Sequence, residues 1–278
     1  MKKKKQKSTM LLVILFLTGL SLLLYPSVAN YWNSLHSSQA IASYAKEVSD
    51  LGKEEYGAVW QAASDYNRAL TENTPGGMPS GEYNKLLNIG GNGIMGQIEI
   101  PAIHMSLPIY HGTSDAVLQT ATGHLEWTSL PVGGESSHCV LSGHRGLPRA
   151  KLFTDLDRLS VGDVFYIRVL NEMLTYEVDQ IRIVSPKDTS ALQIEKGKDY
   201  CTLVTCTPYG INTHRLLVRG HRVDNSAMAD TFRINPDAFQ IEPRLVAAVM
   251  VIPMLLLYIA GITVRNGRTR RREVEANE

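Results

Sequence analysis

The stretch CTLVTCTPYGINTHRLLVRGHR, residues 201–222, has the pattern of a β-hairpin. An apolar run typical of a buried strand ends at Cys206, the Pro208-Tyr209-Gly210 segment is a turn signal, and the returning strand opens with His214 and Arg215. A cysteine in this position has two interpretations. It is either an inert buried thiol or a thiolate nucleophile with a guanidinium beside it.

Short apolar runs with period-two alternation continue on both sides of this hairpin. They are bounded by Gly, Pro, Asn or Asp and read IMGQIEIPAI, SLPIYHG, HCVLSGH, DVFYIRVL, LTYEVDQIRIVSP, YCTLVTCTP and RLLVRGHRV. The helical pieces among them, SDAVLQTA and AKLFTDLDRL, are short. This pattern predicts a mostly β fold, a closed β-barrel over residues 94–224.

The segments that flank the barrel are of different kinds. Residues 30–71 have the spacing of amphipathic helices that bend or separate at Leu51-Gly52, and their aromatic stripe is predicted to pack in the core. Residues 72–93 form a Gly/Pro-rich, lid-like loop region, and residues 225–244 a linker.

Two uncharged apolar segments are long enough to cross a bilayer as helices: residues 10–29 and residues 245–264. The basic tails, residues 1–9 and 265–278, predict that both termini are cytoplasmic and that the domain between the spans is extracytoplasmic. The protein is therefore expected in the cell membrane, in contact with the lipid bilayer. A cleaved signal peptide is the alternative for the first segment.

Charge is distributed unevenly along the 278 residues, although the formal net charge is only +1. The two tails hold 10 of the 28 basic residues and 3 of the 27 acidic ones, which leaves a net charge of −6 between them. An acidic exterior argues against a nucleic-acid partner. The sequence has no metal-binding, Walker or dinucleotide-binding motif, so no cofactor is predicted.

The three cysteines, Cys139, Cys201 and Cys206, leave at least one free thiol. In a regular strand Cys201 and Cys206 lie about 16 Å apart and face opposite sides, because their offset is odd. A disulfide needs Cα atoms within about 7 Å, which excludes that pair. Pairing of Cys139 with either partner stays open.

Two further side chains are candidates for chemistry with Cys206. His144, in VLSGHRG, follows an apolar strand and begins a Gly-rich turn, as Cys206 does. Arg215 is placed by the hairpin turn near the end of the strand that carries Cys206. A histidine can transfer the proton and a guanidinium can stabilise an oxyanion. A surface histidine and a solvent-facing arginine are the alternatives.

These residues resemble a known signature. TLVTC followed by Arg215 is similar to the TLxTC…R motif of the sortases, the cysteine transpeptidases of Gram-positive bacteria, and SGHRG is similar to their histidine loop. The resemblance covers about residues 96–223. The stretches GHLEWTSLPVGGESSHCVLSGHRGLPRAKLFTDLDRL and DYCTLVTCTPYGINTHRLLVRGHR, the second span and the N-terminal helices resemble class C, the pilin-polymerising branch.

The resemblance implies a mechanism. Cys206 attacks the Thr–Gly carbonyl of an LPxTG-like sorting signal, His144 acts as general acid and base, and Arg215 holds the substrate or stabilises the tetrahedral intermediate. A lysine amine of another pilin subunit then resolves the acyl-thioester, so pilin subunits are the implied partners. Thr205 and Leu203, which precede Cys206 on the same strand, are assigned to substrate binding.

The lid region departs from the class C pattern. Class C sortases typically carry an Asp-Pro-aromatic lid motif, whereas this chain has Thr74-Pro75 and Met78-Pro79. We therefore expect an atypical or open lid, with Pro75, Met78 and Tyr83 as candidates. The alternatives for the whole chain are a housekeeping sortase that anchors proteins to peptidoglycan, and a membrane-tethered binding protein in which Cys206 is a buried thiol.

Overall fold

The computed structural model describes residues 2–72 and 80–225, and its folded unit begins at Val28. The second predicted span (residues 245–264), the linker before it and the tail after it lie outside the described residues, as do Pro75 and Met78. Within the described chain, the segment Val13–Ser49 contains an 18-residue window with a mean hydropathy of 1.7, long and apolar enough to cross a membrane.

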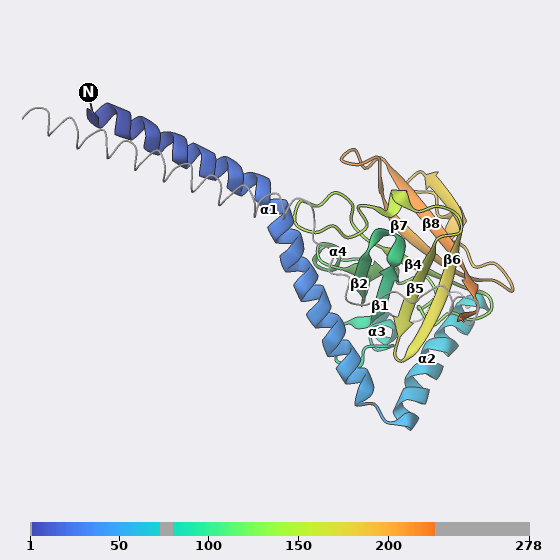
Figure 1. Ribbon diagram of the computed structural model, residues 1–278. Coiled ribbons are helices and arrows are strands. Elements are labelled where there is room, and N and C mark those ends of the chain that lie inside the picture. Colours follow the sequence, from blue (N-terminus) through green and yellow to red (C-terminus); the bar gives the residue numbers. More distant parts are fainter. Residues whose placement is uncertain (1, 73–79, 226–278) are drawn as a thin grey trace, which may run out of the picture. The chain divides into compact units, whose positions relative to one another are not determined.

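Eight strands close into a barrel, which confirms the mostly β, closed-barrel part of the predicted fold class (Figure 1). Neighbours around the barrel follow the order β1-β2-β3-β4-β7-β8-β6-β5. The β2–β3 and β4–β7 pairs are parallel and the other neighbouring pairs are antiparallel. The strands are β1 (Ile94–Ile100), β2 (Met105–His111), β3 (Thr122–His124), β4 (Ser137–Ser142), β5 (Val164–Val169), β6 (Glu172–Val184), β7 (Asp199–Thr207) and β8 (His214–Val223).

Strand β3 is missing from the sequence prediction. It has three residues, Thr-Gly-His, and no apolar alternation. Its Gly123 is held close to the preceding segment, because a Cβ there would lie 2.4 Å from the carbonyl oxygen of Gly112. The helical pieces between strands are shorter than expected: α4 (Asp115–Leu118) and the 3-10 turns η1 (Pro101–Ile103), η2 (Leu156–Arg158) and η3 (Ser190–Leu192).

The helices described before the barrel are α1 (Lys2–Ser49), α2 (Lys53–Thr71) and α3 (Ser80–Tyr83). The first continues through Pro26 as one helix, where the sequence analysis separates residues 10–29 from the helices after them. Buried side chains of α1 and α2 reach the barrel wall: the Tyr44 hydroxyl donates to the Met95 carbonyl at 2.9 Å, and the Tyr66 hydroxyl to the Glu126 carbonyl at 2.7 Å. The aromatic residues of α2 are thus part of the core.

Side chains of β7 alternate between two apolar clusters, one on each side of the barrel wall. Cys201 and Leu203 face the interior, where the main core lies. Val204 faces outward and packs with Val140, Leu192 and Leu217 in a second cluster. This alternation decides which residues at the end of β7 reach the outer surface.

Candidate active site

Three adjacent strands end at the same place on the barrel. Strand β7 lies between β4 and β8, and Cys206 near its end is the register partner of Arg215 in β8. On the other side Ser142 pairs with Val204, and the Gly143 N–H donates to the Val204 carbonyl at 3.1 Å. His144 comes next in the chain, so its backbone lies level with Cys206. The structure therefore brings these three predicted residues into one row.

The thiol and the guanidinium share the outer face of this wall. Cys206 lies two residues after Val204, and Arg215 lies two residues before Leu217, both members of the outer cluster. Because strand side chains repeat their direction every second residue, Cys206 and Arg215 point outward as well. Cys206, His144 and Arg215 are each half-buried, which keeps the row accessible to a ligand.

Two glycines shape the turn that carries His144. A Cβ at Gly143 would lie 2.8 Å from the buried ring of Phe153, and the Phe153 N–H donates to the His144 carbonyl at 3.1 Å. Gly146 has a φ of +79°, and a Cβ there would lie 3.0 Å from the Tyr209 ring. The histidine turn is thus clamped between Phe153 beneath it and the loop that follows Cys206.

Arg145 connects the two loops, and sequence reasoning missed it. Its guanidinium forms an ion pair with Asp157, donates to the Thr207 hydroxyl at 3.5 Å and lies 5.8 Å from the centre of the Tyr209 ring. Its side chain is only 9% exposed. Its position directly after His144 in SGHRG could have indicated a role at this site. A buried guanidinium also needs a carboxylate partner, which Asp157 provides here.

The Arg215 guanidinium has no carboxylate partner among residues 2–72 and 80–225. It donates to the carbonyls of Asn212 at 3.3 Å and His214 at 3.1 Å, at the turn between β7 and β8. Within these ranges no carboxylate neutralises its positive charge. Such a group can bind a substrate carbonyl or an oxyanion.

Leu203 and Thr205 are not placed where substrate could touch them, which corrects their assignment to substrate binding. Leu203 is fully buried in the main core, and Thr205 is 2% exposed. The Thr205 hydroxyl donates to the Gly143 carbonyl at 2.8 Å. Both residues alternate with Cys206 and so face the interior, where Thr205 holds the histidine turn in place.

Tyr83 is also a core residue rather than a side chain over Cys206. It is 2% exposed, its hydroxyl lies 2.9 Å from Nδ1 of His124, and it accepts a hydrogen bond from the Gly112 N–H at 3.1 Å. Burial raises its pKa. This position follows from the packing of Tyr83 against His111 of β2 and His124 of β3, which the sequence pattern of residues 72–93 does not reveal.

The other two cysteines form a buried pair in the core. All three cysteines are free thiols, and Cys139 and Cys201 are register neighbours on β4 and β7. Burial alone would raise the pKa of Cys139, but hydrogen bonds with Cys201 and His124 lower this pKa below its usual range. Burial raises the pKa of Cys201 well above its usual range. Neither thiol reaches the outer face where Cys206 lies.

The described residues contain no cluster of three or more His, Cys, Asp and Glu side chains that could hold a metal ion.

Comparison with known proteins identifies the family. A family model described as a sortase domain matches residues 98–223. The solved sortase C1 of Streptococcus agalactiae is 54% identical, with a TM-score of 0.65, over 67% of this chain and 99% of that chain. This chain belongs to the sortase family. Sortases are cysteine transpeptidases, so the chain is an enzyme of that type.

Other sortases are similar over different shares of their length. Sortase C of Streptococcus pneumoniae is 44% identical over 67% of this chain and 97% of that chain, with a TM-score of 0.62. Sortase D of Bacillus subtilis is 33% identical over 46% of this chain and 63% of its own length. Sortase A of Staphylococcus aureus is 27% identical over 72% of this chain and 86% of its own length.

Proposed function

We propose that this sortase is a class C enzyme that joins pilin subunits through isopeptide bonds. The observation that carries the proposal is the row formed by His144, Cys206 and Arg215 across three adjacent strand ends, with thiol and guanidinium on the outer face. A nucleophile, a proton carrier and an unneutralised cation are the three groups that acyl transfer requires.

In the first half of the reaction, the Cys206 sulfur attacks the carbonyl carbon of the Thr–Gly bond in an LPxTG-like sorting signal. Arg215 stabilises the negative charge that develops on the carbonyl oxygen. The C–N bond then breaks, and His144 donates its proton to the amine that leaves. The product is an acyl-thioester on Cys206.

In the second half, a lysine amine of another pilin subunit attacks the thioester carbonyl. His144 accepts a proton from that amine, the C–S bond breaks, and the Cys206 thiolate is released. The new bond is an isopeptide bond between the threonine of one subunit and the lysine of the next.

The sequence comparisons favour class C over a housekeeping role. Class C structures are 42–54% identical to this chain, whereas three of the curated relatives named Sortase A are 25–29% identical. Pilin substrate specificity has been described for the sortase C of Streptococcus pneumoniae, which is among these structures. Housekeeping anchoring to peptidoglycan remains the second candidate, because several curated relatives carry the name Sortase A.

The location proposed with this function is the outer side of the cell membrane. The apolar part of α1 supports an N-terminal anchor. Both termini in the cytoplasm, a second span at residues 245–264 and an extracytoplasmic barrel complete the proposal. A membrane-held enzyme would then meet pilin subunits held in the same membrane. The lid also stays a proposal, with Pro75 and Met78 as the remaining candidates.

The decisive experiment is mass spectrometry of the purified full chain mixed with an LPxTG-type peptide. We expect an acyl adduct on Cys206 with the mass of the peptide minus its segment after threonine, and none in Cys206→Ala. Adding a pilin subunit or a peptidoglycan stem peptide as the amine then separates the two roles. A chain that binds the peptide without forming an adduct would instead be a tethered binding protein.

A further inference from the structure

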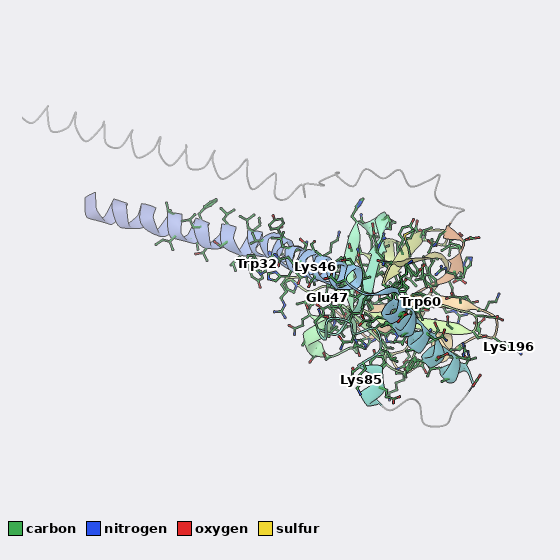
Figure 2. The ribbon with its side chains drawn as sticks, turned by 90° about the horizontal axis from the view of Figure 1, so that it is seen from below. Trp32, Lys46, Glu47, Trp60, Lys85 and Lys196 are labelled. Atoms are coloured by element: carbon green, nitrogen blue, oxygen red, sulfur yellow. The ribbon has the colours of Figure 1, made fainter. Side chains whose placement is uncertain are left out.

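The first turns of α1 in the folded unit present two different faces. Tyr31 and Trp32 are 50% and 65% exposed, and Figure 2 shows Trp32 on α1. On the other side of the same turns, Asn30, Asn33 and Ser34 line a cavity against the barrel. Exposed Tyr and Trp directly after an apolar span are typical of residues at a membrane–water interface.

These turns lie at the depth of lipid headgroups if residues 10–29 span the bilayer. A helix rises about 1.5 Å per residue, so Ser34 is about 8 Å beyond residue 29. The headgroup layer on one side of a bilayer is about 5–8 Å thick. The cavity lined by Asn30, Asn33 and Ser34 therefore opens in or just above that layer.

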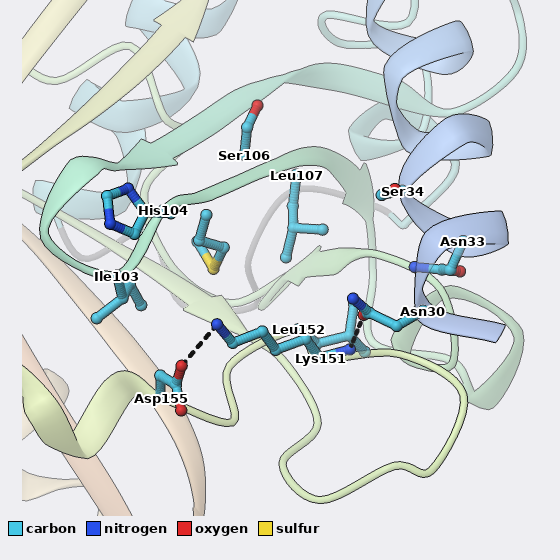
Figure 3. Close-up of a pocket in the computed structure, with 11 residues that line it drawn as sticks. Asn30, Asn33, Ser34, Ile103, His104, Ser106, Leu107, Lys151, Leu152 and Asp155 are labelled. Atoms are coloured by element: carbon cyan, nitrogen blue, oxygen red, sulfur yellow. Dashed lines mark hydrogen bonds and ion pairs between the residues drawn. The ribbon is translucent and has the colours of Figure 1, made fainter. Parts of the chain in front are cut away.

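The cavity has an apolar floor and a polar rim. Its volume is about 100 Å³, and it lies between α1, the turn from β1 to β2, and the loop at residues 151–155 (Figure 3). Asn30 Oδ1 accepts a hydrogen bond of 2.8 Å from the Lys151 N–H, which fixes the loop against the helix. Ile103, Met105, Leu107 and Leu152 provide the apolar part of the lining.

Lys151 supplies a cation that can change partners. Its ammonium lies 2.7 Å from Asp155 Oδ2, yet its side chain is 45% exposed. Asp155 also pairs with Arg158 at 3.4 Å, so this carboxylate keeps a counter-charge when Lys151 turns to another anion. Figure 3 shows the Lys151 side chain extending along the cavity toward Asp155.

The loop around Lys151 is basic in a domain that is otherwise acidic. Residues 144–158 contain four basic and two acidic residues, a net charge of +2, against −6 for the whole segment between the tails. Arg149 is exposed beside Lys151. Basic residues at a membrane surface attract anionic lipids.

We propose that this cavity is a binding site for the headgroup of an anionic glycerophospholipid. Lys151 and Arg149 contact the phosphodiester oxygens, and the glycerol portion lies on the apolar floor. The inference depends on the proposed membrane anchor but not on the proposed reaction. Because the same loop continues from His144, a bound headgroup would hold the histidine turn at the membrane surface.

Native mass spectrometry of the full chain in detergent tests the proposal, with phosphatidylglycerol and phosphatidylcholine of matched acyl chains as probes. The wild type should retain phosphatidylglycerol in preference. Lys151→Gln should reduce its retention about fivefold, as expected for one basic residue near an anionic surface. Arg149→Gln should weaken it similarly, and neither variant should change the retention of phosphatidylcholine.

Lys85→Gln is the matched control, because Lys85 is an exposed lysine after α3, outside the cavity lining (Figure 2). It removes the same charge and should leave lipid retention unchanged. Equal loss in all three variants, or no loss in Lys151→Gln, would overturn the site. Displacement of the lipid by inorganic phosphate would assign it to a soluble anion instead. None of these measurements requires transpeptidation, so failure of the proposed reaction would be seen separately.

Discussion

Cys206 and Arg215 lie at the ends of β7 and β8, His144 lies in the turn after β4, and the position of each is fixed through the backbone. Cys206 is in register with Arg215. Gly143, the residue before His144, forms hydrogen bonds with Val204 and Thr205. Arg145 then joins the loop after His144 to the loop after Cys206. At this scale the backbone alone holds the three residues in one row.

Replacing Arg215 by Ala should slow formation of the acyl-thioester about 10²–10³-fold, the usual effect of removing one oxyanion donor. The expected loss follows from the absence of a carboxylate at this guanidinium in the described structure, which leaves its charge for the substrate. Single-turnover mass spectrometry with a sorting-signal peptide measures the rate. Arg168→Ala, at an exposed arginine of β5, should retain the wild-type rate; a normal rate in Arg215→Ala would remove Arg215 from the reaction.

At the scale of elements, the site depends on the close contact between the histidine turn and the segment that leads into η2. Gly143 lies against Phe153, and Phe153 in turn bonds the backbone of His144. The turn also rests on β7 through Thr205. Movement of this turn by a few tenths of an ångström would shift His144 relative to Cys206 without any change in either side chain.

Gly143→Ala should lower thioester formation and destabilise the fold by about 1–3 kcal/mol, because the added methyl group would lie 2.8 Å from the Phe153 ring. Alkylation of Cys206 should still occur, since the thiol itself stays in place. Phe153→Leu makes room for the methyl group. The double variant Gly143→Ala/Phe153→Leu should therefore form the thioester faster than the product of the two single-variant losses predicts. Strictly multiplicative effects would show that this contact does not position His144.

The sequence predicted the strands whose side chains alternate or form apolar runs, because burial imposes that pattern directly. It missed β3, because three residues are too few to show a pattern. The glycine at position 123 is needed because the backbone of Gly112 passes close to it, and the sequence does not show that contact. It indicated Cys206, His144 and Arg215 through their positions at strand ends. It misplaced Leu203 and Thr205, because proximity in sequence to Cys206 does not tell which face of the barrel wall a side chain takes.

At the scale of the whole molecule, β4, β7 and the segment before β7 are linked by a buried histidine. His138 Nδ1 donates to the Gln193 carbonyl at 2.9 Å, and its Nε2 accepts from the Thr202 hydroxyl at 2.7 Å. Burial lowers the pKa of His138. Folding therefore favours the neutral imidazole more than the unfolded chain does.

Stability should fall as the pH drops from about 7.5 to about 5.5, because the unfolded chain protonates His138 near its ordinary pKa of about 6.5 while the folded chain resists it. The stability that neutral His138 contributes is thus complete above the pKa of the unfolded chain and is lost as the pH falls below it. Urea midpoints of the full chain in detergent at both pH values measure the slope, which should be smaller in His138→Gln. Burial also lowers the pKa of His111, which the wild type and His138→Gln share. If the slope of stability with pH is the same in both, His138 is not its source.

The last strand of the barrel has a consequence for when the enzyme can act. Strand β8 pairs with both β6 and β7, and it carries the guanidinium that faces Cys206. Until β8 is in place the wall is incomplete, and Cys206 lacks its register partner Arg215. Assembly of the proposed site is thereby coupled to the last strand, so a chain folded only as far as β7 would lack one of its three groups.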